Sequence, residues 1–179
     1  MTSFKTIRES EQIDVTAGKC TYGQMVELGR VLDAAFKRSE AGEGNDVDTI
    51  KKLIRTLHPD SSPSISTTNV RYAMEIASAV RMWRERENEK LKYTPSDEER
   101  AAGYEALSKI TGPTGVASTI AEKFGVYGGP NEVFKWEYAT VFMVLYIDLE
   151  RYKFQKRLQD IRDRKRRQKD KSARMGRRK

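Results

Sequence analysis

The amino-acid sequence predicts an all-α protein, and three observations support this prediction. Apolar residues recur at intervals of three and four along most of the chain, which is the spacing of one helix face. Glycine and proline residues fall between these segments, where they act as helix stops. Charged residues make up 34% of the 179 residues and apolar residues 37%, as in helices with wide polar faces. We expect a bundle of about six helices with a long C-terminal helix and a short extended N-terminal arm.

The first elements are predicted from capping residues and glycines. Residues 1–20 are polar, with weak alternation of apolar positions, and we assign them to the extended arm. A helix is expected to begin at Thr21, because Thr21 and Gln24 have the spacing of a capping box. Gly42 and Gly44 end this helix.

Proline and glycine residues divide the middle of the chain. A second helix is predicted for 46–57, since Pro59 cannot continue it. A long helix follows at about 69–90. Thr94, which precedes a proline, is the predicted N-cap of a fourth helix. That helix is expected to end near Gly112, which another proline follows.

The last part of the chain is predicted to hold a short helix and a long one. Residues 114–124 form the short helix. The long helix is expected to start at Pro130, and no proline or glycine interrupts it before Gly176. We divide the chain into the arm, a helical bundle domain of residues 21–156, and a basic helical extension of residues 157–179.

The composition argues against several classes of function. One cysteine and one histidine leave no internal disulfide and make a metal site within one chain unexpected. We predict no metal and no cofactor. The sequence contains no phosphate-binding loop, nucleophile elbow or zinc-protease motif, so we predict no catalytic residues and no enzymatic activity. The N-terminal residues lack the apolar segment of a secretory signal, and the longest apolar run, 141–147, is too short to cross a membrane.

The segment 133–147 is apolar on nearly every side of the predicted final helix, so it must be covered all round. Either the other helices of the bundle cover this segment, or a partner chain covers part of it. A four-three spacing continues to Leu149 and Tyr152, which leaves self-association through a short coiled coil as a further option. The candidate partner-binding residues are Phe134, Trp136, Tyr138, Phe142 and Tyr146.

The C-terminal segment is strongly basic. The chain has 34 Lys and Arg against 26 Asp and Glu, a net charge of +8. Residues 151–179 hold 15 of these cations and three aspartates, which leaves residues 1–150 with a net charge of −4. Nucleic acid, an acidic partner protein, or no partner at all are equally compatible with this charge. The candidate contact residues are Arg162, Arg164, Lys165, Arg166, Arg167, Lys169, Lys171, Arg174, Arg177, Arg178 and Lys179.

Two short motifs offer other interpretations. His58, Pro59 and Asp60 follow a basic helix, as in the loop by which J-domain co-chaperones engage an Hsp70, although the rest of that signature is absent. Residues 119–126 and 130–136 resemble a helix-turn-helix. The turn is too long, however, and the second helix offers mainly aromatic side chains.

Residues 48–156 resemble small helical proteins encoded in Bacteroides phages and prophages. The segments that carry the resemblance are Leu57–Asp60, Trp83–Pro95, Ala121–Val126, Phe134–Tyr146 and Asp148–Lys156. Those proteins are similar to the tail-assembly chaperones of long-tailed phages. The resemblance implies that this chain binds a tape-measure protein and keeps it soluble until the tail tube forms around it.

We therefore predict a phage morphogenesis protein with a protein partner, a tail or other virion component. Its expected location is the host cytoplasm, with the virion as an alternative. Nucleic-acid binding through the helix-turn-helix-like segment and the basic extension is the second hypothesis. Residues 157–179 lie outside the resemblance.

Overall fold

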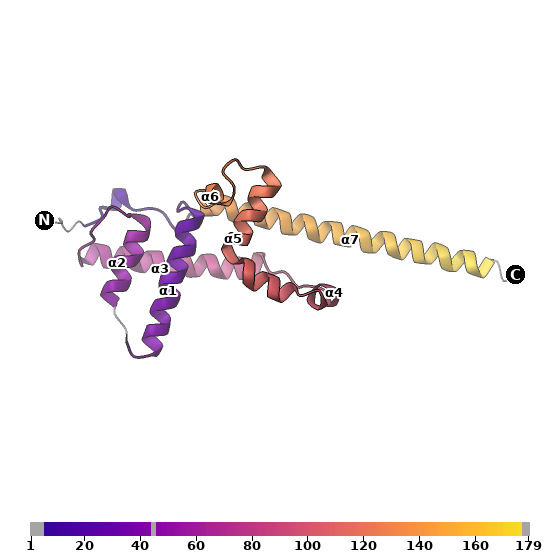
Figure 1. The fold of residues 1–179 in the computed structure, drawn as a ribbon, viewed down its shortest axis with the longest axis horizontal. Helices are drawn as coiled ribbons and strands as arrows, with labels where there is room; N and C mark the ends of the chain where they lie inside the picture. Colours follow the sequence, from indigo (N-terminus) through magenta and orange to yellow (C-terminus); the bar gives the residue numbers. More distant parts are fainter. Residues whose placement is uncertain (1–5, 44–45, 177–179) are drawn as a thin grey trace. The chain divides into compact units, whose positions relative to one another are not determined.

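The computed structural model describes residues 6–43 and 46–176, and their side chains except those of 105–111 and 170–176. Within these residues the protein is all-α, as predicted, and contains no strand. The elements are the 3-10 helix η1 (Glu9–Glu11) and the α-helices α1 (Tyr22–Glu40), α2 (Asp46–Leu57), α3 (Thr67–Lys90), α4 (Asp97–Ala101), α5 (Tyr104–Phe124), α6 (Pro130–Val133) and α7 (Tyr138–Gly176) (Figure 1).

The chain divides into two compact units, Met1–Phe142 and Met143–Lys179. The first unit contains every helix from η1 to α6 and the first turn of α7. The second unit consists of the remainder of α7. The predicted boundaries after residues 20 and 156 are not those of the two units.

The first two long helices begin and end where the sequence predicts. Thr21 accepts a hydrogen bond from the Gln24 backbone N–H, and the Gln24 side chain accepts one from the Thr21 N–H. These reciprocal bonds satisfy two backbone donors that the first helical turn leaves without partners. Helix α2 ends at Leu57, two residues before Pro59.

The predicted fourth helix is wrong in its start and its continuity. Its N-cap is Ser96 rather than Thr94, because the Ser96 hydroxyl accepts from the Glu99 N–H and the Glu99 carboxylate accepts from the Ser96 N–H. The helix ends after one turn and α5 begins behind Gly103, whose φ of 91° suits glycine. Gly112 then kinks α5, with φ 46° and ψ −148°.

A helix begins at Pro130 as predicted, but it does not continue into the long final helix. Helix α6 stops at Val133, and α7 begins only at Tyr138. The Phe134 carbonyl accepts from the Gly23 N–H at 2.9 Å, and the Trp136 carbonyl accepts from the Tyr22 N–H at 2.8 Å. These carbonyls are therefore used in a short antiparallel pairing with the start of α1 instead of continuing the helix.

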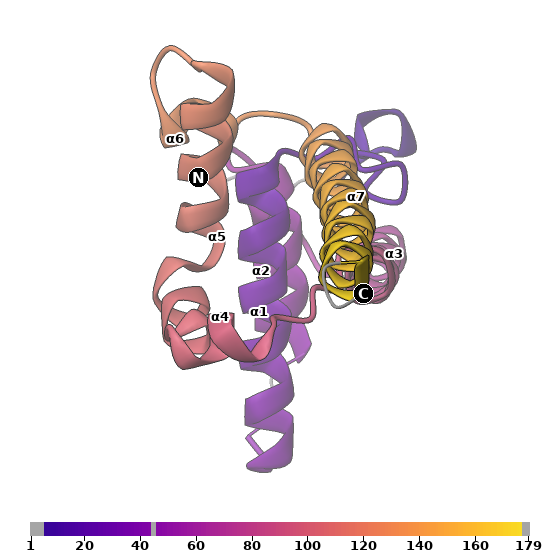
Figure 2. The same cartoon turned by 90° about the vertical axis from the view of Figure 1, so that its right-hand side faces the viewer.

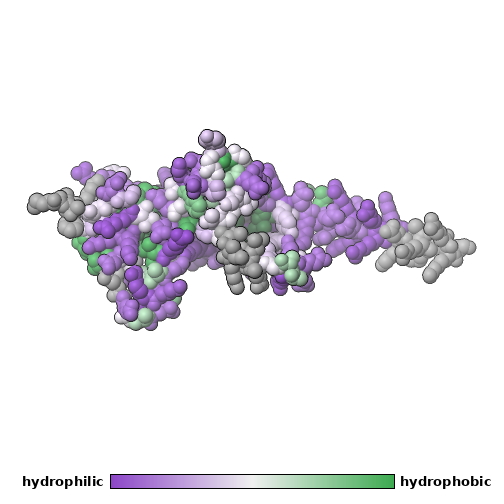
Figure 3. Space-filling view, viewed as in Figure 1, coloured by the Kyte–Doolittle hydropathy of each residue, from purple (hydrophilic) through white to green (hydrophobic). Residues whose placement is uncertain are grey.

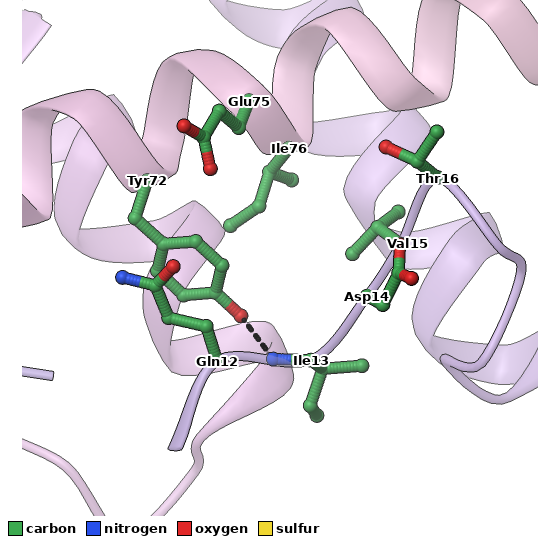
Figure 4. A pocket seen from close by; sticks show the side chains of 8 residues that line it. All are labelled: Gln12, Ile13, Asp14, Val15, Thr16, Tyr72, Glu75 and Ile76. Atoms are coloured by element: carbon green, nitrogen blue, oxygen red, sulfur yellow. Dashed lines mark hydrogen bonds between the residues drawn. The ribbon is translucent and has the colours of Figure 1, made fainter. Parts of the chain in front are cut away.

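The N-terminal segment is part of the core rather than a free extended arm. Ile7 and Val15 are buried. The Ile7 N–H donates to the Asn69 side chain, and the Ile13 N–H donates to the Tyr72 hydroxyl (Figure 4). Figure 4 shows this segment running beside α3. The segment is mostly polar, but these two apolar residues are buried, and α3 side chains accept hydrogen bonds from its backbone N–H groups.

The core of the first unit forms where α1, α2 and α3 pack together, with contributions from α5, α6 and the start of α7. Figure 2 shows α1 between α5 and α3. Apolar side chains with almost no exposure come from all these elements: Leu28, Ile54, Ile76, Val80, Ile120, Val133 and Val141. Their burial supplies most of the driving force for folding this unit.

Candidate functional site

Two adjoining hollows lie between α1 and α3, and we name them together the α1–α3 groove. Their volumes are about 300 and 410 Å³. Both are lined by Asp33, Val80 and Arg84, so they meet at these three residues. The first hollow is also lined by Tyr22, Met25, Gly29, Trp83, Glu87 and Tyr138. The second is also lined by Leu32, Phe36, Asp46, Ala77 and Arg81.

Helical spacing brings these residues together. On α1 the lining residues include positions 22, 25, 29, 33 and 36, and on α3 they include 77, 80, 84 and 87. Steps of three and four keep each set on one side of its helix. The groove therefore follows from the same periodicity that builds the core, and it occupies the edge of the two buried faces.

An ion pair crosses the groove at its middle. The Arg84 guanidinium donates from both terminal nitrogens to the two Asp33 carboxylate oxygens, at 2.7 and 2.8 Å. Arg84 in turn holds the pKa of Asp33 below its usual value. Gly29 leaves space for this guanidinium, since a Cβ there would lie 2.8 Å from one of its nitrogens. Both partners are solvent-exposed, so the pair fixes geometry and adds little stability.

The first hollow is lined by aromatic side chains and by the carboxylates of Asp33 and Glu87. The Tyr138 hydroxyl donates to Glu87, and the Tyr138 ring meets Trp83 edge-on at 5.0 Å. Burial raises the pKa of Tyr138, and its bond to Glu87 raises it further. Burial and the Glu87 charge raise the pKa of Tyr22 to about 12. Both phenols therefore stay protonated at neutral pH and are unsuited to act as bases.

The second hollow has both apolar and charged side chains in its lining. The Phe36 side chain is 66% exposed, and Leu32, Ala77 and Val80 lie beside it along the hollow. Met74, one turn before Ala77 on α3, is 69% exposed. Figure 3 shows hydrophobic side chains at the surface among hydrophilic ones on the face it presents. Exposed phenylalanine and methionine at a hollow are typical of protein contact sites.

The sequence-predicted aromatic residues divide between interior and surface. Tyr138 and Phe142 are buried, and both rings contact Trp83. Their rings are therefore engaged inside the protein and are not available to a partner in this structure. Phe134, Trp136 and Tyr146 are half-buried, and the Phe134 ring stacks on Tyr22 at 5.4 Å. Partner binding by these three stays a prediction.

The predicted basic residues of α7 are exposed as far as their side chains are described. These are Arg162, Arg164, Lys165, Arg166, Arg167 and Lys169. Nearer the start of the second unit, Lys153 forms an ion pair with Glu150 at 2.8 Å. Lys171 and Arg174 lie outside the described side chains, and Arg177, Arg178 and Lys179 lie outside the described residues.

Of the two short motifs, the one at His58 packs against α3, and the helix-turn-helix-like one lacks a second helix of sufficient length. His58 Nε2 lies 3.1 Å from the Tyr72 hydroxyl, so the histidine ring is held against α3, while Pro59 and Asp60 are exposed. In the helix-turn-helix-like segment, the would-be recognition helix is α6, which has only four residues. A helix that short cannot present a row of side chains along a DNA groove.

Sequence reasoning missed most of the groove. Phe36 shares its predicted helix face with Met25 and Leu28, and its exposure can be recognised only once α3 is placed. The Asp33–Arg84 pair joins residues 51 positions apart, and no local pattern links them. The pair can be predicted only after α1 and α3 have been placed side by side, when the positions of Asp33 and Arg84 along their helices can be compared.

Within the described part of the chain, no three His, Cys, Asp or Glu side chains gather as metal ligands would. None of its helices has both the length and the apolar character that crossing a bilayer requires. Comparison with models of protein families, with curated proteins and with solved structures gave no match to this chain.

Proposed function

We propose that this chain is a non-enzymatic assembly chaperone that holds an amphipathic helix of a long helical partner in the α1–α3 groove. The observation that carries the proposal is the exposed Phe36 side chain, which lies beside Leu32 and Ala77 in a hollow of about 410 Å³. In the setting that the sequence resemblance implies, the partner is a tape-measure-type phage protein in the host cytoplasm.

The lining of the groove fits such a partner. A helix laid into a groove places apolar side chains at every third or fourth position into the hollow and keeps its charges at the rim. Leu32, Phe36 and Ala77 supply the apolar surface. Asp46 and Arg81 at the rim carry opposite charges, so a helix with acidic and basic flanks is accommodated.

The test is co-expression of the full chain with the product of the long helical reading frame in its gene neighbourhood. We expect that product to be soluble only in the presence of the chaperone and to co-purify with it. Phe36→Asp places a charge in the hollow and should reduce the recovered complex at least tenfold, since a misplaced charge in an apolar contact costs more than about 1.4 kcal/mol.

Val47→Asp is the matched control. Val47 is an exposed apolar residue on α2 that does not line the groove, and its substitution should leave the complex intact. The proposal is wrong if the partner is equally soluble without the chain, or if Phe36→Asp and Val47→Asp lower recovery to the same extent.

The exposed cations of α7 favour nucleic-acid binding as a second candidate function. Arg162, Arg166 and Arg167 are among six exposed basic residues within two turns of helix. Contacts to phosphates alone predict binding to duplex DNA that weakens steeply as salt rises. A gel-shift titration at several salt concentrations measures this slope, and replacing those three arginines by glutamine should lower its magnitude by about three. Absence of any shift at low salt rules this candidate out.

A further inference from the structure

The second unit carries a row of exposed apolar side chains that the proposed function does not use. Met143 is 50% exposed, Ile147 42%, Phe154 57% and Ile161 51%, and Leu158 is half-buried. At about 100° of rotation per residue, these five positions fall within an arc of about 60° on α7. We name them the α7 stripe.

The α7 stripe is not the seam that the sequence suggested. That seam continues from Tyr138 through Leu149 and Tyr152, which lie on the opposite side of the helix at about 180° from Phe154. Its four-three spacing starts from Tyr138, which is buried in the core of the first unit. The spacing therefore follows the side of α7 that packs against that core. The α7 stripe contains the larger share of strongly exposed apolar side chains.

The central part of the α7 stripe, Ile147, Phe154 and Ile161, is symmetric about Phe154. Ile147 and Ile161 are each seven residues from Phe154, and Glu150 and Leu158 are each four residues from it. Met143 and Lys165 are each eleven residues away. Ile147, Phe154 and Ile161 therefore match a second copy of the helix turned end to end, with a two-fold axis at Phe154, while the pairs at four and eleven residues join unlike side chains.

Charge distinguishes this antiparallel arrangement from a parallel one. In a parallel pair, Glu150 would face Glu150 and Lys165 would face Lys165, and like charges in a seam destabilise it. In the antiparallel pair, Glu150 faces Leu158 and lies next to Arg157 of the second copy. Met143 faces Lys165, whose aliphatic stem covers apolar surface while its ammonium reaches water.

The basic ends point to the same choice. A parallel pair would place both copies of Arg162–Lys169 side by side. In the antiparallel pair the two Arg162 positions are sixteen residues apart along the seam, about 24 Å, which is beyond the screening length of about 8 Å in physiological salt. We propose that two copies of this chain associate through the α7 stripe in antiparallel orientation, with Phe154 against Phe154.

Cysteine cross-linking of the full-length chain tests the partner and its direction. Cys20 is fully buried, so an introduced surface cysteine is the reactive thiol. Under mild oxidation, Phe154→Cys should form a disulfide-linked dimer by itself. Ile147→Cys and Ile161→Cys should each stay largely monomeric alone and give a cross-linked dimer when the two are mixed.

The other outcomes overturn the proposal. Efficient self-cross-linking of Ile147→Cys and of Ile161→Cys, with none between them, means a parallel pair. Preferential cross-linking of Tyr152→Cys, which lies on the other side of α7, means that the sequence-predicted seam is the interface. No cross-link in any variant, together with a monomeric mass in sedimentation equilibrium, means that α7 does not self-associate.

A charge substitution provides an independent measurement. Phe154→Glu should shift the sedimenting species from dimer to monomer, raising the dimer dissociation constant at least tenfold, while Tyr152→Glu should not. Helix content by circular dichroism verifies that both variants fold. The groove variant Phe36→Asp should retain the dimer, so this proposal and the proposed chaperone function fail in separate experiments. A dimer unaffected by Phe154→Glu contradicts the assignment of the interface.

Discussion

The two units of this protein obtain their stability in different ways. In the first unit, Trp83 is 4% exposed, contacts two other aromatic rings and donates its indole N–H to the Val15 carbonyl at 2.9 Å. In the second unit, no residue between 143 and 169 is buried. A helix in the first situation is fixed by tertiary packing, whereas one in the second depends on its own backbone hydrogen bonds and on partners.

Helix α7 takes part in both situations. Tyr138 and Phe142 belong to the core of the first unit, and the residues from Met143 to Lys169 are all exposed or half-buried. The comparison shows how one continuous helix can begin inside a core and then leave its surface open for contacts. Substitutions in the two units should therefore affect stability to very different degrees.

The largest expected effect is that of Trp83→Ala. This substitution removes a buried indole and one of two hydrogen bonds that the Val15 carbonyl accepts, the other coming from the Gly18 N–H. The free energy of unfolding should fall by about 3–5 kcal/mol. Urea denaturation followed by circular dichroism measures the loss. Trp136→Ala is the matched control, because Trp136 is half-buried and the hydrogen bond that it accepts from α1 goes to its backbone carbonyl, which the substitution keeps. Equal losses in both variants would refute the ranking.

Gly18→Ala should be the next most damaging change. Gly18 has φ +72°, and a Cβ there would lie 2.9 Å from both the Ala139 side chain and the Trp83 ring. Backbone strain of about 1–2 kcal/mol and overpacking of about 1–3 kcal/mol should both appear in the unfolding free energy. Gly42, with φ +75° and no atom within 4 Å of the position that a Cβ would take, isolates the first contribution. A Gly42→Ala loss as large as that of Gly18→Ala would show that the contact is unimportant.

The positions of the helix ends show which part of the fold the sequence could predict. Helices α1 and α2 follow from Thr21, Gln24 and Pro59, because caps and breakers act within a few residues. The break between α6 and α7 was missed because it depends on pairing of residues 18–23 with 134–139, which are far apart in sequence. No helix-breaking residue marks that break, so tertiary hydrogen bonds override the local preference for helix.

The candidate site divides in the same manner. The apolar character of Tyr138 and Phe142 correctly predicted a covered position, but the sequence alone offered both the core and a partner as the cover. The groove depends on how α1 lies against α3, and the polar residues Asp33 and Arg84 gave no sign of belonging to one place. Long-range placement is the information that local periodicity lacks.

A smaller effect is expected from titration of Tyr22. Burial and the nearby Glu87 charge raise its pKa from 10 to about 12. The folded state therefore keeps the phenolic proton at pH values where the unfolded chain releases it, so stability present below pH 10 is lost as pH rises towards 12. Between pH 9 and 11 the loss from this group should be about 1 kcal/mol.

The variant Tyr22→Phe should remove this part of the alkaline destabilisation. Urea titrations at pH 9 and 11 measure the difference, with Tyr127→Phe as control because Tyr127 is 99% exposed. An unchanged pH dependence in Tyr22→Phe would mean that Tyr22 does not titrate abnormally.

The smallest effect should come from removing residues 157–179. Both tryptophans, Trp83 and Trp136, lie in the first unit, so their fluorescence reports the unfolding of that unit alone. We expect the unfolding free energy from fluorescence in urea to change by no more than about 0.5 kcal/mol, as for surface changes away from the core.

Circular dichroism also reports α7, so in the full chain its transition should be broader than the fluorescence transition. The two transitions should approach each other after truncation, because less helix remains outside the core. A marked fall in the fluorescence midpoint would mean that the first unit depends on the basic end of α7, and the contrast between the units would then be lost.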